Sequence, residues 1–152
     1  MIYGTSNDRN MIKLIKWINK FPIIPIFGSG NYLQQPIHVE DVAWAVVEVI
    51  NNKNCFMKEF NIGGANALKF KSIIEIVKSL LNKKCIQINL SHKLFIYIFK
   101  IFEKLNIQFM IKAEQIERLN ENKCFSNEEA IKAFNFRPVN FEEGITKEIN
   151  LY

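Results

Sequence analysis

Apolar residues recur at helical spacing in several stretches of this chain, and short apolar runs separate those stretches. After Asn7 and Asp8, which can cap a helix, the pattern predicts a helix running to about Lys20. Further helices are predicted over Glu40–Asn51, Phe70–Asn82, His92–Leu105, Lys112–Asn120, Glu128–Phe134 and Phe141–Ile149. The runs between them predict extended segments at Met1–Gly4, Ile23–Phe27, Ile37–Val39, Glu59–Ile62 and Ile86–Leu90. Because strands and helices alternate along the chain, the predicted class is α/β.

Two of these helices have the clearest signals. The segment that starts with Glu40 and Asp41 carries both acids where a helix N-terminus favours negative charge. The Phe70–Asn82 segment is amphipathic, and its predicted buried side consists of Ile73, Ile74, Val77, Leu80 and Leu81. Pro25 interrupts the Ile23–Phe27 run, so we expect an edge strand there.

The length of 152 residues, 49% of them hydrophobic, suits a single domain spanning residues 1–152. The net charge of +5 comes from scattered lysines with no run longer than Lys83-Lys84, so the charge does not indicate a nucleic-acid partner. Three widely separated cysteines form no pair typical of a zinc site or a disulfide framework, which favours a reduced, cytoplasmic protein. No apolar stretch is long enough for a membrane span.

One apolar stripe allows more than one interpretation. Phe95, Ile96, Phe99 and Phe102 share a face of the predicted helix His92–Leu105. Core packing or a subunit contact is the favoured role. The alternative is attachment to a membrane surface, although Lys93, Lys100 and Lys104 are few for a basic face.

Four segments, in order, resemble the C-terminal half of the extended short-chain dehydrogenases, the NAD-dependent epimerases and dehydratases of nucleotide sugars. Met1-Ile2-Tyr3-Gly4 is similar to the end of the family's Arg-Pro-x-x-x-Tyr-Gly segment. Residues 35–43, QPIHVEDVA, resemble its Ile-His-Val-x-Asp-Val-Ala junction, and residues 60–64, FNIGG, resemble Tyr-Asn-Ile-Gly-Gly. Residues 125–145 resemble the family's ending. Gln35-Pro36 and the segment 118–125, RLNENKCF, are closest to an atypical branch of this family.

The resemblance implies the C-terminal part of a Rossmann-like NAD(P)-binding fold together with a smaller, mostly helical substrate-binding lobe. In the family, a glycine-rich turn after the first strand holds the dinucleotide, and a Tyr-x-x-x-Lys pair exchanges protons with the sugar. None of the six glycines in this sequence falls in such a turn, and no tyrosine is followed by lysine four positions later. We therefore expect NAD or NADP only in the complete enzyme, and we expect this chain alone to be inactive.

The resemblance also implies which residues approach the ligands. Tyr3 and Gly4 correspond to a segment near the nicotinamide end of the cofactor cleft, and Asn7 and Arg9 follow at the start of a helix where substrate could bind. A plain capping role for Asn7 is the alternative.

Two further positions concern the substrate diphosphate. Many relatives have an arginine four residues before the histidine of Ile-His-Val, and this sequence has Gln34 there, which offers no charge to phosphate. Arg118 and Glu121 have the spacing of a late Arg-x-x-Asp pair that contacts phosphate and ribose in relatives. An ordinary surface pair on a helix is an equally good interpretation of Arg118 and Glu121.

His38 and Asp41 are expected to be structural, the first at a strand end and the second at a helix start. Two functions remain open: the substrate-binding part of a nucleotide-sugar epimerase, dehydratase or reductase, or a non-catalytic module that binds a nucleotide or a protein. The partners implied are a nucleotide sugar and either an N-terminal Rossmann half or further copies of the chain. Without such a half, an uncovered sheet edge and apolar face would make the isolated chain self-associate or dissolve poorly.

Overall fold

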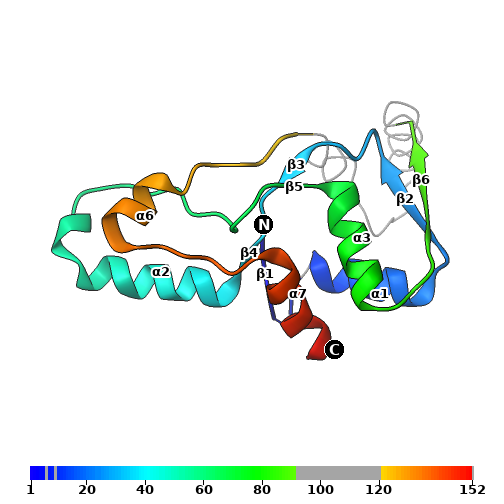
Figure 1. Ribbon diagram of the computed structural model, residues 1–152, viewed down its shortest axis with the longest axis horizontal. Coiled ribbons are helices and arrows are strands. Elements are labelled where there is room, and N and C mark those ends of the chain that lie inside the picture. The colour runs from blue at the N-terminus through cyan, green and yellow to red at the C-terminus, as the bar shows by residue number, and fades with distance from the viewer. Residues whose placement is uncertain (6, 9, 92–120, 152) are drawn as a thin grey trace, which may run out of the picture.

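The computed structural model describes residues 1–5, 7–8, 10–91 and 121–151, and combines helices with three separate pairs of short strands (Figure 1). The strands are β1 (Ile2–Tyr3), β2 (Ile23–Phe27), β3 (Leu33–Gln34), β4 (Ile37–His38), β5 (Leu68–Lys69) and β6 (Ile86–Leu90). The helices are α1 (Met11–Lys20), α2 (Val39–Asn51), the short 3-10 helix η1 (Lys53–Cys55), α3 (Phe70–Leu80), α6 (Glu128–Phe134) and α7 (Phe141–Asn150).

The strands pair across long stretches of sequence. β1 pairs with β4 in parallel, with Ile2 opposite Ile37 and Tyr3 opposite His38. β2 pairs with β6, also in parallel, and β3 pairs with β5 in the antiparallel sense. Parallel pairs need long connections, which here contain the helices, so the predicted α/β class is confirmed.

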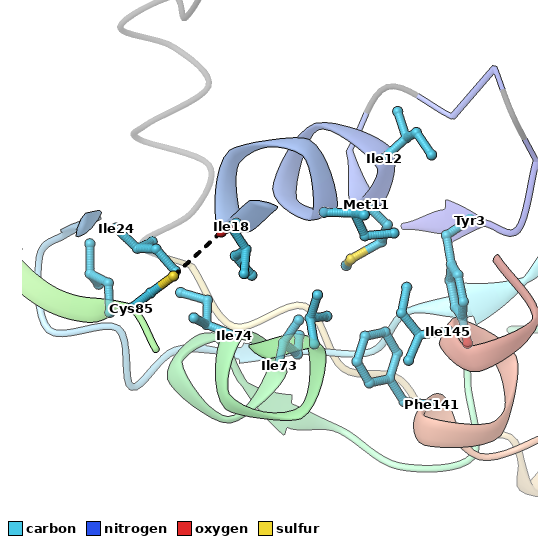
Figure 2. Close-up of a cluster of buried hydrophobic side chains, with 13 residues drawn as sticks. Tyr3, Met11, Ile12, Ile18, Ile24, Ile73, Ile74, Cys85, Phe141 and Ile145 are labelled. Atoms are coloured by element: carbon cyan, nitrogen blue, oxygen red, sulfur yellow. Dashed lines mark hydrogen bonds between the residues drawn. The ribbon is translucent and has the colours of Figure 1, made fainter. Parts of the chain in front are cut away.

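The larger apolar core lies between α1, α3 and α7 (Figure 2). Ile15, Ile73, Ile74 and Ile145 are fully shielded from solvent within it. Asp8, rather than Asn7, caps α1: its carboxylate accepts hydrogen bonds from the backbone N–H groups of Met11 and Ile12. At the far end of this core the Cys85 thiol donates to the carbonyl of Ile18 over 3.5 Å.

A second apolar cluster lies between α2 and α6, at the other end of the elongated molecule (Figure 1). Its buried members are Ile37, Ala45, Cys55, Ala130, Phe134 and Phe136. The two clusters meet the β1–β4 pair from opposite sides, because alternate residues of a strand point to opposite faces.

Most of the predicted elements are confirmed, with ends shifted by one or two residues. The predicted strand Glu59–Ile62 is wrong, since this segment is irregular. Phe60 and Ile62 do turn toward the second cluster, but no strand pairs with the segment in the described part of the chain. The predicted helices His92–Leu105 and Lys112–Asn120 lie outside the described residues. Among the helices that are described, none is long and apolar enough to cross a membrane.

Candidate functional site

The end of β1 is held tightly between β4 and α7. The Tyr3 ring meets the rings of His38 and Phe141 edge-on, each with a centroid distance of 5.4 Å, and Tyr3 is only 2% exposed. A methyl group on Gly144 would come within 2.2 Å of the Tyr3 hydroxyl oxygen, so glycine is needed there. Burial, with smaller effects of Asp41, Glu148 and Glu143, raises the pKa of Tyr3 above its ordinary value.

Gly4 continues this close packing in the backbone. Its φ of +109° is one that glycine adopts readily, and a Cβ there would lie 2.4 Å from Nε2 of His38. The Gly4 N–H donates to Oε2 of Glu148 over 3.1 Å. The polar groups of Tyr3 and Gly4 therefore face other parts of this chain.

Glu148 is a buried carboxylate that the sequence analysis missed. It lies near the C-terminal end of α7 with no exposed surface, and its Oε1 has no hydrogen-bond partner among the described residues. Burial, assisted by the carboxylate of Asp8, raises the pKa of Glu148 to about 7, against the lowering effect of the Gly4 N–H. Its position, three after Ile145 and on the apolar side of the helix, was the available sequence signal.

His38 and Asp41 have the structural roles that were predicted. His38 is 3% exposed, and its Nδ1 accepts a hydrogen bond from the Glu40 N–H at the start of α2. Asp41, in the first turn of α2, accepts from the Val139 N–H over 3.1 Å. Burial raises the pKa of Asp41 although this hydrogen bond lowers it.

Two residues that were predicted separately as substrate contacts meet at β3. Gln34 is 5% exposed, and its side-chain amide donates to the backbone carbonyl of Glu121 over 3.1 Å. The backbone of Lys123 pairs with the same strand, and its N–H donates to the carbonyl of Leu33 over 2.7 Å. The Glu121 side chain stays exposed, with Lys123 Nζ 4.0 Å from its Oε2.

Beside this junction lies a network of amide side chains that sequence reasoning did not find. Gln35 donates to the carbonyl of Gly64 and accepts from the N–H of Phe125. Asn127 accepts from the N–H of Gly63 and donates to the carbonyls of Gly63 and Gly64. The Gly63-Gly64 segment is thereby fixed against both Gln35, just before β4, and the segment before α6. Long-range bonds of this kind leave no local pattern in a sequence.

The remaining predicted site residues are Asn7, Arg9 and Arg118. Asn7 is exposed, and Arg9 and Arg118 lie outside the described residues. A shallow depression of about 590 Å³ between η1 and α6 is lined by none of the predicted site residues; its lining is Asn54, Lys58, Glu59, Phe60, Glu129, Lys132 and Ala133.

The arrangement of elements is similar to that of several solved structures of nucleotide-sugar epimerases and dehydratases. The dTDP-glucose 4,6-dehydratase of Bacillus anthracis, solved with NAD, matches the whole chain with a TM-score of 0.69 and 18% identity. The UDP-glucuronic acid 4-epimerase of Bacillus cereus, solved with UDP-glucuronic acid and NAD, matches it with a TM-score of 0.71 and 18% identity. This chain has the Rossmann-like fold of the nucleotide-sugar epimerases and dehydratases.

The chain spans less than half of these proteins. It covers 42% of the Bacillus anthracis dehydratase and 44% of the Bacillus cereus epimerase. A curated relative, subunit 9 of the NADH dehydrogenase 1 alpha subcomplex from Arabidopsis thaliana mitochondria, is 25% identical over 79 residues. That match takes in 51% of this chain and 20% of the plant protein. No family model matches the sequence.

The epimerase and dehydratase fold agrees with the order of motifs in the sequence, from Tyr3-Gly4 through Ile37-His38 to the last helix. The Gly4 N–H is bonded to Glu148, and none of the six glycines of the sequence falls in a glycine-rich phosphate turn. The assignments of Tyr3 and Gly4 to cofactor, and of Asn7, Arg9, Gln34, Arg118 and Glu121 to substrate, stay predictions.

Proposed function

We propose that this chain is the substrate-binding part of an NAD(P)-dependent nucleotide-sugar epimerase, dehydratase or reductase, and that it catalyses no reaction by itself. The fold supports this function class. The observation that carries the substrate role is the hydrogen bond from Gln34 to Glu121, which joins two predicted substrate contacts separated by 87 positions.

The arrangement at β3 suits a neutral part of a nucleotide sugar. The Gln34 amide holds the backbone of Glu121, and the exposed carboxylate of Glu121, although 4.0 Å from Lys123 Nζ, has further lone pairs that can accept hydrogen bonds from ribose or sugar hydroxyls. A carboxylate repels phosphate, so the diphosphate is expected to lie toward a cation such as Arg118. NAD(P) would supply the hydride acceptor when bound in the complete enzyme; the present residues orient substrate.

Titration calorimetry of the purified chain tests this proposal, with UDP-glucose and dTDP-glucose in one series and NADH in another. We expect a sugar nucleotide to bind and NADH not to bind. Gln34→Ala should weaken binding roughly three- to tenfold, because it removes one of the hydrogen bonds that hold the Glu121 segment to β3. The matched control is Gln87→Ala on β6, whose amide bonds the exposed Glu75 and which should change nothing.

A folded chain that binds neither sugar nucleotide would overturn the substrate role. Equal affinity of the two glutamine variants for the sugar nucleotide would show that Gln34 does not contribute to the binding site. Urea unfolding of each variant, run in parallel, separates a loss of binding from a loss of structure.

A further inference from the structure

The β2–β6 pair lies at the end of the molecule opposite α2 and α6, and its inner face covers the larger core (Figure 1). Ile24 and Ile26 of β2 are buried on that face. Their partners in the parallel register are Gln87 and Asn89 of β6, which therefore point to the same side. The Gln87 amide accordingly donates to the Glu75 carboxylate on α3 over 2.6 Å. β6 thus turns its polar residues toward the protein.

The outer face of the same pair is apolar. Ile23 of β2 and Ile86 and Ile88 of β6 alternate with the inner residues, and they are 46%, 68% and 41% exposed. A strand face that meets water usually carries polar residues. β6 has the reverse pattern, so its alternation favours an apolar surrounding on the outside.

An aromatic pair extends this surface at the start of β2. Phe21 is 41% exposed, and its ring centroid lies 4.7 Å from that of Trp17. The Trp17 indole donates to the carbonyl of Ile23 over 2.8 Å, which fixes the pair beside the strand. We define the outer patch as Phe21, Ile23, Ile86 and Ile88.

Three exposed lysines lie at one end of the outer patch. Lys20 comes shortly before β2, and Lys83 and Lys84 come shortly before β6. Because the two strands are parallel, these approaches adjoin, and the Ile86 N–H donates to the carbonyl of Pro22 over 2.9 Å. Lys20 Nζ lies 5.5 Å from the centroid of the neighbouring Phe21 ring. The apolar patch therefore has a basic margin.

Acidic residues are missing from the two segments that build this surface. The sequence has no Asp or Glu in residues 9–39 or 76–102, which contain both strands. Glu75 lies on the inner side of the pair, where its Oε2 is 2.8 Å from Lys78 Nζ. The charge that these segments carry thus has one sign.

We propose that the outer patch, with Lys20, Lys83 and Lys84, attaches the protein peripherally to an anionic lipid surface. The apolar side chains would enter the boundary between headgroups and acyl chains, and the lysines would attract the anionic headgroups. A protein partner is disfavoured because lysine is depleted at protein interfaces. A second copy is disfavoured because a two-fold axis would bring two basic, acid-free surfaces together. This surface is distinct from the apolar stripe predicted in His92–Leu105, and the inference is independent of the proposed function.

Flotation of the 152-residue chain with lipid vesicles tests the proposal, because vesicle-bound protein rises in a gradient and protein aggregates do not. We expect the chain to float with vesicles of phosphatidylcholine and phosphatidylserine, and to stay behind with phosphatidylcholine alone. Added salt should weaken the binding, because it screens the attraction between lysines and headgroups.

Two substitutions locate the binding surface. Ile86→Thr makes the patch less apolar and keeps a β-branched side chain suited to a strand, and Lys84→Gln removes a charge. Each should lower the affinity for anionic vesicles roughly three- to tenfold. The matched controls are Ile131→Thr and Lys132→Gln on α6, where Ile131 is 47% exposed and Lys132 is also exposed. These controls should leave the affinity unchanged.

A folded chain that floats with neither kind of vesicle, or equally with both, would overturn the proposal. Equal losses from the two pairs of variants would also overturn it. A dimer in analytical ultracentrifugation that Ile86→Thr dissociates would assign the outer patch to a second copy instead. A lower urea midpoint for Ile86→Thr would show that the chain itself covers this side chain, and would exclude it from a lipid contact.

Discussion

The two helices that flank the β1–β4 pair differ in how much of their apolar surface is used. On one side α7 buries Phe141, Gly144, Ile145 and even the carboxylate of Glu148. On the other side Ala45 is the one buried residue of the much more apolar α2. On the side of the sheet that faces α7 the apolar side chains are buried. On the side that faces α2 the residues are as apolar as in a core, but most of them are exposed to solvent.

Removing the same side-chain atoms from each helix should show this contrast most strongly. Ile145→Ala deletes atoms with no exposure, so we expect a loss of roughly 2–5 kcal/mol in the free energy of unfolding. Ile50→Ala deletes atoms that already contact water and should change it by less than about 0.5 kcal/mol. Urea unfolding of the 152-residue chain measures both. Similar losses for the two variants would show that the Ile50 side chain is already covered.

A methyl group added at each of two adjacent glycines gives a smaller effect. On Gly64 it would lie 1.9 Å from the backbone carbonyl oxygen of Pro36, which cannot move without disturbing β4. On Gly63 it would meet the end of the Gln35 side chain, which can shift only by weakening its own hydrogen bonds. We expect Gly64→Ala to cost about 3 kcal/mol and Gly63→Ala about 1 kcal/mol. Urea unfolding of the two variants measures which loses more free energy of unfolding. A larger loss for Gly63→Ala would contradict the described packing.

The α7 side of the sheet should also respond to pH. The pKa of Glu148 is about 7 in the folded state and has its ordinary, lower value in the unfolded state. The folded state therefore binds one more proton between these two values. The free energy of unfolding should fall as pH rises toward 7 and then level off. The groups nearest to this carboxylate are the Asp8 carboxylate and the Tyr3 hydroxyl, and the Tyr3 ring in turn contacts His38. Glu148→Gln should flatten the slope in unfolding experiments between pH 5 and about 8. Glu142→Gln, exposed on the same helix, should retain the slope.

The smallest effect is expected for the ion pair that connects the two helices. Lys147 Nζ on α7 lies 2.9 Å from Oε2 of Glu40 on α2, and both side chains are exposed. Water and salt screen such a pair, so Lys147→Ala should leave the urea midpoint unchanged within error at high salt. A large loss that persists in high salt would mean that the pair is shielded from solvent, and that the two sides of the sheet are joined more firmly than their packing indicates.

Local patterns were sufficient for most of the helices. The spacing of Ile73, Ile74 and Val77 predicted the buried side of α3, and Glu128–Phe134 was predicted with its observed bounds. The family resemblance indicated that His38 lies at a strand end before a helix, which the structure confirms. These successes rest on contacts within a few residues, for which side-chain periodicity is a direct guide.

What failed or was missed depends on distant partners. Glu59–Ile62 has the alternation of a strand, but its end is held by the Asn127 side chain rather than by a neighbouring strand. The pairing of β3 with β5, and the meeting of Gln34 with Glu121, join segments more than 30 and 80 positions apart. Burial of Glu148 contradicts the usual preference of glutamate for solvent, and only the Gly4 N–H explains part of it.

The bond between Gly4 and Glu148 spans 144 positions, and it sets the order in which the protein can mature during synthesis. Tyr3 needs Phe141 and Gly144 to complete its surroundings, so β1 reaches its final packing only after α7 has been synthesised. Contacts of such separation slow folding because a long loop must close before they form.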